Sequence, residues 1–210
     1  NIHGSLLPKY RGRVPINWAI IQGEQETGAT LHVMNEKPDN GAIVAQMAVP
    51  ILKNDTATQV FSKVTVAAEC ILLRVLPDLC AGTARLIEQD LTKGAYYSGR
   101  KAEDGQINWQ QSAIQIHNLI RAVTHPFPGA FFDIGTIRIF IWQTQVLTDT
   151  HDYSKAHWRL TNGQILAYCQ GGGILQIENW SILRDNQSQI GNTALFQTLF
   201  GEHLQLTHES

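Results

Sequence analysis

The sequence predicts an α/β domain followed by a small β-rich domain. In the first half, short β-branched runs alternate with stretches whose apolar residues recur every three or four positions, the spacing of an amphipathic helix. Beyond Pro126 the pattern changes to short strands separated by Gly and Asp turns, which is typical of a small β-barrel or sandwich. A polar, glycine-containing stretch over 90–106 predicts a linker between them. We expect domains at 1–98 and 107–210, with the linker itself at 99–106.

A short helix and two strands are predicted near the start of the chain. Pro15 suits the first turn of a helix that Gly23 would end. Strands are expected at 29–34 and 43–49. The sequence Pro38-Asp39-Asn40-Gly41 between them predicts a turn, because Pro fixes φ while Asn and Gly tolerate a positive φ.

A long helix is the clearest element of the first half. Asp55 or Thr56 can cap it, and it is expected to run over 56–76 with Pro77 near its end. Three- and four-residue spacing predicts that one face carries its apolar residues, which are Val60, Phe61, Val64, Ala67, Ala68, Ile71, Leu72 and Val75.

The second half is predicted to hold one helix and a series of short strands. The helix covers about 112–123 and packs Ile114, Ile116, Leu119 and Ile120. The strands are expected at 130–132, 136–146, 164–169, 174–177 and 180–183. Gly171-Gly172-Gly173 falls between two strands and lacks both GxGxxG and a P-loop lysine, so a hairpin turn is favoured over a phosphate loop.

Composition excludes several classes of protein. The 210 residues carry 16 Lys+Arg and 18 Asp+Glu, for a net charge of −2, and 43% of them are hydrophobic, which excludes a disordered chain. No apolar run approaches the ~20 residues of a membrane span, so no membrane partner is expected. Residues 104–210 have a charge of −3 and the first 103 have +1, which argues against a nucleic-acid partner.

Cysteine and histidine usage points to a cytoplasmic protein without a bound metal. The three cysteines, Cys70, Cys80 and Cys169, form no CxxC and suit a reducing compartment. The eight histidines show no metal-binding spacing. His151 and His157 flank a polar loop and are expected at the surface.

The first candidate site combines Asn1, His3 and Asp39. An amide can donate to a developing oxyanion, an imidazole can move a proton, and a carboxylate can orient the imidazole. On a strand, Asn1 and His3 would point to the same face. From residue types alone, a merely structural histidine stays open.

The second candidate is the basic segment from Ser5 to Arg13. Its three cations could hold an anion at the start of the following helix, although a solvated basic loop is an equal alternative. Ser5 lacks a G-x-S-x-G context, which argues against a nucleophile.

Four segments together resemble the formyltetrahydrofolate-dependent formyltransferases. They are NIHGSLLPKYRGR from residue 1, ETGATLH from 26, DNGAIVAQ from 39 and RAVTHPFPGA from 121, in that family's order and spacing. The resemblance implies a Rossmann-like catalytic domain, of which residues 1–98 are the C-terminal half, and an OB-like β-barrel domain at 107–210. It also implies that the 210 residues are a piece of a longer protein, inactive alone.

The resemblance also implies roles for individual residues. Asn1 is similar to the family's oxyanion donor, His3 to its acid/base, and Asp39 to the carboxylate that raises the pKa of that histidine. Arg13 and the loop of Asn35, Glu36, Lys37, Pro38 and Asp39 resemble its folate-binding residues. The co-substrate would be N10-formyltetrahydrofolate, with no metal. A neutral amine would attack the formyl carbon, and His3 would move a proton from the amine towards N10 so that tetrahydrofolate can leave.

The acceptor implied by the resemblance is a nucleotide-linked aminosugar. Arg13-Val-Pro-Ile-Asn17-Trp18 is similar to the family's aminosugar branch, especially its UDP-4-amino-4-deoxy-L-arabinose formyltransferases, which serve lipid A modification. A methionyl-tRNA formyltransferase is the first alternative, and a non-catalytic folate or nucleotide-sugar binding module is the second. A homo-oligomer stays open.

Overall fold

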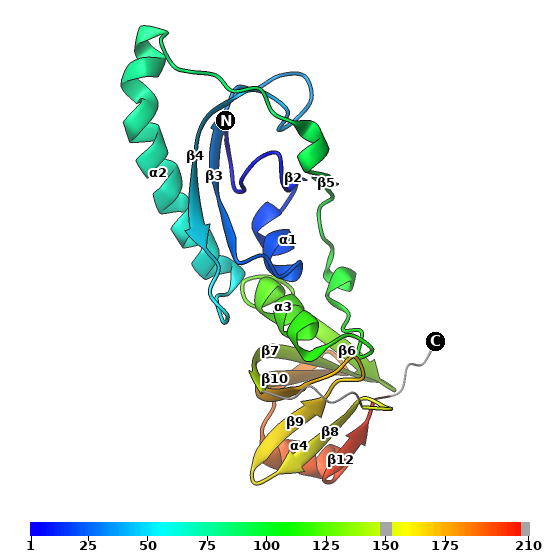
Figure 1. Ribbon diagram of the computed structural model, residues 1–210. Coiled ribbons are helices and arrows are strands. Elements are labelled where there is room, and N and C mark those ends of the chain that lie inside the picture. The colour runs from blue at the N-terminus through cyan, green and yellow to red at the C-terminus, as the bar shows by residue number, and fades with distance from the viewer. Residues whose placement is uncertain (148–152, 207–210) are drawn as a thin grey trace. The chain divides into compact units, whose positions relative to one another are not determined.

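The computed structural model describes residues 1–147 and 153–206, which fall into two compact units, Asn1–Arg100 and Lys101–Ser210. His151 lies outside the described residues, so its expected surface position has no structural counterpart. The two units correspond to the α/β and the β-rich halves that the sequence predicts (Figure 1).

A three-stranded antiparallel sheet forms the centre of the first unit. Its order is β1 (Ile2–His3), β3 (Glu26–His32) and β4 (Ile43–Pro50). The predicted strands are therefore present, although β3 begins three residues earlier than expected and ends at His32. Helix α1 (Pro15–Ile21) has Pro at its first turn, as predicted, and buries Ile16, Ala19 and Ile20.

Helix α2 (Ala57–Ala81) lies along one face of this sheet (Figure 1). Thr56 caps it through a capping box with Gln59, which confirms one of the two expected caps. The expected end at residue 76 is too early, because the helix continues through Pro77 to Ala81 and is capped by Gly82 with φ +69°. An interior proline removes one backbone donor from the helix but leaves the following turn free to form.

The predicted apolar face of α2 is only partly buried. The buried residues form a narrow stripe, made up of Ala57, Val60, Val64, Ala67 and Ile71. Phe61 is 62% exposed and Leu72 38% exposed, contrary to the expectation that they share this face. The sheet covers only about one residue in each turn of α2. Apolar residues on either side of this buried stripe therefore stay in contact with water.

The segment over 90–98 belongs to the first unit and does not act as a linker. Asp90 caps the 3₁₀ turn η1 (Leu91–Lys93), and β5 (Tyr96–Tyr97) pairs in parallel with β2 (Arg11–Gly12). The ring of Tyr97 contacts those of Tyr10 and Trp18. The mostly polar sequence of 90–98 did not predict this strand pair, because its packing depends on two tyrosines, Tyr96 and Tyr97, and not on an apolar run.

The second unit is built on a curled antiparallel sheet that forms a half-barrel. Along the sheet the strands run β12 (His203–Gln205), β8 (His157–Thr161), β9 (Gln164–Tyr168), β10 (Ile174–Arg184), β7 (Ile137–Leu147) and β6 (Ala130–Ile134), and β11 (Gln187–Ile190) pairs with β10. The 3₁₀ turn η2 (Ala102–Gly105) precedes helix α3 (Ala113–Val123), which packs on β7, and α4 (Thr193–Phe200) packs near β8.

Several predictions for this unit are confirmed and others are corrected. The helix at 112–123 is present with Ser112 as its cap, although Ile114 is 52% exposed. The strands expected at 174–177 and 180–183 are one strand, β10, with an irregularity between Ile177 and Trp180. A bulge shifts the alternation of side chains without ending the ladder, so the pattern looked interrupted.

The glycine triplet forms the predicted hairpin turn between β9 and β10, closed by a hydrogen bond from Cys169 N to Gly173 O. His157 keeps part of its surface exposed, as expected, but it does not belong to a loop. It lies half-buried on β8, an element that the sequence did not predict, and its ring stacks on Tyr168 with centroids 4.5 Å apart.

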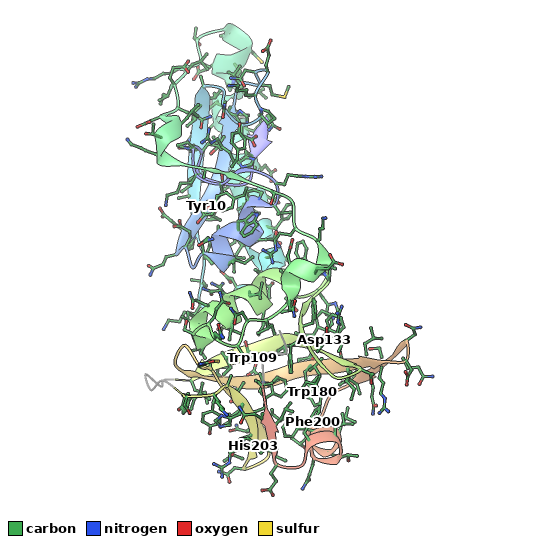
Figure 2. The ribbon with its side chains drawn as sticks, turned by 90° about the vertical axis from the view of Figure 1, so that its right-hand side faces the viewer. Tyr10, Trp109, Asp133, Trp180, Phe200 and His203 are labelled. Carbon is green, nitrogen blue, oxygen red and sulfur yellow. The ribbon has the colours of Figure 1, made fainter. Side chains whose placement is uncertain are left out.

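Large aromatic side chains fill the core of the second unit. Trp158 and Phe196 are fully buried, and the ring of Trp158 contacts those of Trp109 and Trp180. Figure 2 shows Trp109 and Trp180 inside this unit. These rings supply the apolar area on which the curled sheet closes.

Candidate active site

Strand β1 brings Asn1 and His3 to the sheet beside β3. His3 pairs with Thr30 in the antiparallel register, and Asn1 exchanges backbone hydrogen bonds with His32. The His3 side chain is 7% exposed, whereas the side chain of Ile2 between the two points away and is 39% exposed. The alternation of a strand therefore places Asn1 and His3 on one side, as the sequence predicts.

The loop between β3 and β4 brings Asp39 to His3. Asp39 adopts a left-handed backbone conformation with φ +58°, and its carboxyl group is nearly buried. Its Oδ2 accepts a hydrogen bond from Gly12 N at 2.8 Å, and its Oδ1 lies 3.5 Å from His3 Nδ1. This separation is longer than that of an ordinary hydrogen bond.

Both ring nitrogens of His3 have defined neighbours. Nε2 lies 2.7 Å from the carbonyl oxygen of Tyr10. A carbonyl can only accept, so Nε2 carries a proton and donates it to this bond. Nδ1 is therefore the nitrogen that can gain and lose a proton, on the side that faces Asp39.

His32 joins the site, although the sequence did not single it out. Its Nδ1 donates to Val33 O at 2.9 Å, so its Nε2 accepts from Asn1 Nδ2 at 3.2 Å; the same Nε2 lies 3.7 Å from Asp39 Oδ1. Burial is the largest cause and lowers the pKa of His32, while the hydrogen bond to Val33 O and, to a smaller extent, the carboxylate of Asp39 only partly oppose it. The antiparallel pairing of residues 1–3 with 30–32 could have revealed this neighbour.

The predicted folate-binding residues fall into two places. Residues 35–38 form an exposed loop directly before the buried Asp39. Arg13 is exposed and packs towards Gly99, and its backbone N–H donates to Tyr97 O. Among the hydrogen bonds and ion pairs of the described residues, none joins Arg13 to the loop or to Asn1, His3 and Asp39.

The three cations of the basic segment do not converge on one point. Lys9 pairs with Glu24 at 3.3 Å, while Arg11 is buried and donates to the carbonyl oxygens of Leu91 and Gly94. Ser5 is fully buried and donates to Lys9 O, which makes it a structural hydroxyl. The anion site that the sequence left open is therefore not formed.

The described residues contain neither a candidate metal cluster nor a candidate membrane-spanning helix. Over 1–147 and 153–206, no three His, Cys, Asp or Glu side chains are grouped so that they could hold a metal ion. In the same part of the chain no helix combines the length and apolar character that a bilayer crossing requires.

Comparison with known proteins gives matches over both units. The N-terminal model of the formyl transferase family matches residues 1–76, and the model of its C-terminal domain matches residues 100–190. Among solved structures, an N-formyltransferase from Helicobacter canadensis in complex with folinic acid and dTDP-3-aminofucose has a TM-score of 0.70. It is 23% identical to this chain, with 85% of this chain and 65% of the other covered.

Two further structures share the fold. A 4-N formyltransferase from Francisella tularensis is 29% identical over 60% of this chain and 52% of its own, with a TM-score of 0.55. HypX from Aquifex aeolicus in complex with tetrahydrofolic acid is 20% identical over 96% of this chain and 35% of its own, with a TM-score of 0.65. The chain thus spans about two thirds or less of the length of these proteins. With both domain models matched and the Asn–His–Asp group assembled, the chain belongs to the formyl transferase family.

Proposed function

We propose that this chain supplies the catalytic group of an enzyme that transfers a formyl group from N10-formyltetrahydrofolate to the amine of a nucleotide-linked aminosugar. The observation that carries the proposal is the assembly of Asn1, His3 and Asp39, with atoms 3.5 Å apart or less between His3 and its two neighbours Asp39 and Tyr10. Family membership identifies the chemistry for which such a group is suited.

Each residue has a distinct task in this reaction. The amine attacks the formyl carbon, and the Asn1 amide donates a hydrogen bond to the oxygen as negative charge develops there. Asn1 Nδ2 has two hydrogens, of which one is given to His32, so the second is available. His3 Nδ1 takes the proton of the attacking amine and returns it to N10 of the leaving tetrahydrofolate, while Asp39 stabilises the imidazolium between these two steps.

The formyl donor is proposed to bind at the exposed loop of residues 35–38 and at Arg13. The loop leads directly into Asp39, so a pterin held there would lie next to the catalytic carboxylate. Folinic acid and tetrahydrofolic acid in the complexes of the H. canadensis and A. aeolicus proteins support a folate as the donor. Three cysteines without disulfide partners among the described residues agree with a cytoplasmic location.

An aminosugar is proposed as the acceptor because of its structural relatives. The H. canadensis structure holds dTDP-3-aminofucose, and the F. tularensis protein is a 4-N formyltransferase. Within this class we propose UDP-4-amino-4-deoxy-L-arabinose, and hence lipid A modification, as the first case to test, because Asn17 and Trp18 follow the pattern of that branch.

The test is a formyl-transfer assay on the protein as the cell makes it. Formyltetrahydrofolate is offered with UDP-4-amino-4-deoxy-L-arabinose, dTDP-3-aminofucose or initiator methionyl-tRNA, and the formylated product is identified by mass spectrometry. We expect transfer to an aminosugar nucleotide, and His3→Asn should lower kcat by about 10³-fold, the combined size of proton-transfer and orientation losses.

His203→Asn is the matched control, because His203 is exposed on β12 in the second unit. It should keep the activity of the unchanged protein. Transfer to methionyl-tRNA alone would replace the aminosugar proposal. Folate binding without transfer to any of the acceptors would support a binding module instead.

A further inference from the structure

The segment that carries Asp39 is held by side chains from distant parts of the first unit. Arg11 Nη1 donates to Asn40 Oδ1 at 2.9 Å, and the hydroxyl of Tyr96 lies within hydrogen-bonding distance of Asn40 Oδ1 and Pro38 O. The amide of Gln89 donates to the carbonyl oxygens of Asp39 and Gly41 at 3.0 and 2.6 Å. Residues 38–41 are thus bound at four consecutive positions.

Arg11 binds Asn40 from a buried position in which its charge has no carboxylate partner among the described residues. It is 6% exposed, yet none of the ion pairs of the described residues includes it, and its Nε has no hydrogen-bond partner. Its charge is met by three neutral oxygens, those of Asn40, Leu91 and Gly94, and by the ring of Tyr96 at 4.6 Å. A buried cation without a carboxylate is an unfavourable arrangement for stability alone.

Asp39 needs such support because of its backbone. Its φ of +58° lies in a region that residues with a Cβ seldom adopt, and such strain persists only where the surroundings enforce it. The next residue of β2 completes the hold, since Gly12 N donates to the Asp39 carboxylate itself. Strand β2 therefore contacts both the backbone segment, through Arg11, and the carboxylate, through Gly12.

We propose that Arg11 and Tyr96 are positioning residues, which hold Asn40 and thereby keep the Asp39 carboxylate in register with Gly12 N and His3 Nδ1. The inference rests on the proposed function for the role of Asp39 in catalysis. Neither side chain touches the reacting atoms. Their proposed effect on proton transfer depends on where they place the Asp39 carboxylate.

Amide hydrogen exchange tests the placement without any need for activity. The Gly12 amide reports its bond to Asp39 Oδ2, while the Arg11 and Arg13 amides report the pairing of β2 with β5 through Ala95 O and Tyr97 O. In Tyr96→Phe, which keeps the ring beside Arg11, we expect Gly12 to exchange about tenfold faster and the other two amides to stay within about twofold. In an Asp39→Ala background, Tyr96→Phe should add nothing at Gly12.

Tyr97→Phe is the matched control on the same strand and should leave the Gly12 exchange rate unchanged. Equal acceleration of all three amides in Tyr96→Phe would mean that Tyr96 only stabilises the strand pair, and an unchanged Gly12 rate would mean that it does not hold Asp39. Either result overturns the proposal. Asn40→Ala removes the acceptor that Arg11 and Tyr96 share, so it should accelerate Gly12 exchange in the same way.

Kinetics separate this inference from the proposed function. Where the unchanged protein transfers formyl groups, Tyr96→Phe should lower kcat about tenfold, because a misplaced carboxylate weakens proton transfer. A change in KM alone would contradict a positioning role. Absence of transfer by the unchanged protein refutes the proposed function, and the Gly12 exchange rate then decides by itself whether Tyr96 holds Asp39.

Discussion

His32 determines which way the amide of Asn1 faces. Because its Nδ1 donates to Val33 O, its Nε2 accepts from Asn1 Nδ2, and burial keeps the ring neutral by lowering its pKa. A protonated ring would offer a donor where the Asn1 amide also donates. The oxyanion role proposed for Asn1 therefore depends on a neutral His32.

The lowered pKa of His32 predicts a pH dependence of stability. Below about pH 6.5, the usual histidine pKa, the unfolded chain takes up a proton that the folded chain resists, so stability is complete above this pH and is lost as the pH falls towards the folded pKa. His32→Gln should cost about 1 kcal/mol at pH 7 through the lost hydrogen bond but lose less stability between pH 7 and pH 5. Urea unfolding at several pH values checks this. Parallel losses in both proteins would contradict it.

The reactivity of each cysteine should depend on whether its thiol is buried or exposed. Cys169 is fully buried and burial raises its pKa to about 12, whereas Cys70 and Cys80 lie exposed on α2. The thiolate is the reactive form, so an aromatic disulfide reagent at pH 8 should label only the two exposed thiols of the folded protein. Quantifying the released chromophore before and after denaturation measures the difference. Rapid labelling of Cys169 in the folded state would be inconsistent with its packing.

The buried stripe of helix α2 should contribute to stability, whereas its exposed face should contribute little. Ile71 is fully buried and Leu73, two residues further on, is 66% exposed. Ile71→Ala should cost about 2–5 kcal/mol through lost burial and the cavity it leaves, whereas Leu73→Ala should change stability by about 0.5 kcal/mol or less. Chemical denaturation of both variants gives the comparison. Similar losses would show that the exposed face is covered in solution.

Capping residues fixed the starts of the two longest helices. Thr56 with Gln59 and Ser112 with Gln115 each form a reciprocal capping box, and both helix starts were predicted within one residue. Such signals are local, because the bonds join residues three apart. The end of α2 was misjudged because a single proline weakens a helix without stopping it when the flanking turns can form.

At the scale of the whole chain, the two units have separate cores. Trp158, Phe196 and Trp180 pack with one another inside the second unit, whose helix α3 also covers β7. Residues 101–210 produced alone should therefore fold and unfold cooperatively. Near-ultraviolet circular dichroism reports the order of the tryptophans, and a sharp thermal transition is expected. A featureless spectrum would mean that this unit depends on the first.

By itself the sequence determined the two-unit organisation, the major helices and most strands, and it singled out Asn1, His3 and Asp39 as a candidate group. These follow from periodicity, capping and a motif confined to the first 46 residues, all of which are local in the chain. The tertiary structure decided that His32 faces Asn1 across an antiparallel pair, and that Arg11 and Tyr96 hold Asn40. It also decided that Lys9 and Arg11 bind different partners, Glu24 for Lys9 and Gly94 O for Arg11. Contacts between residues 29 to 83 positions apart depend on register and burial, which a side chain acquires only when the sheet has formed.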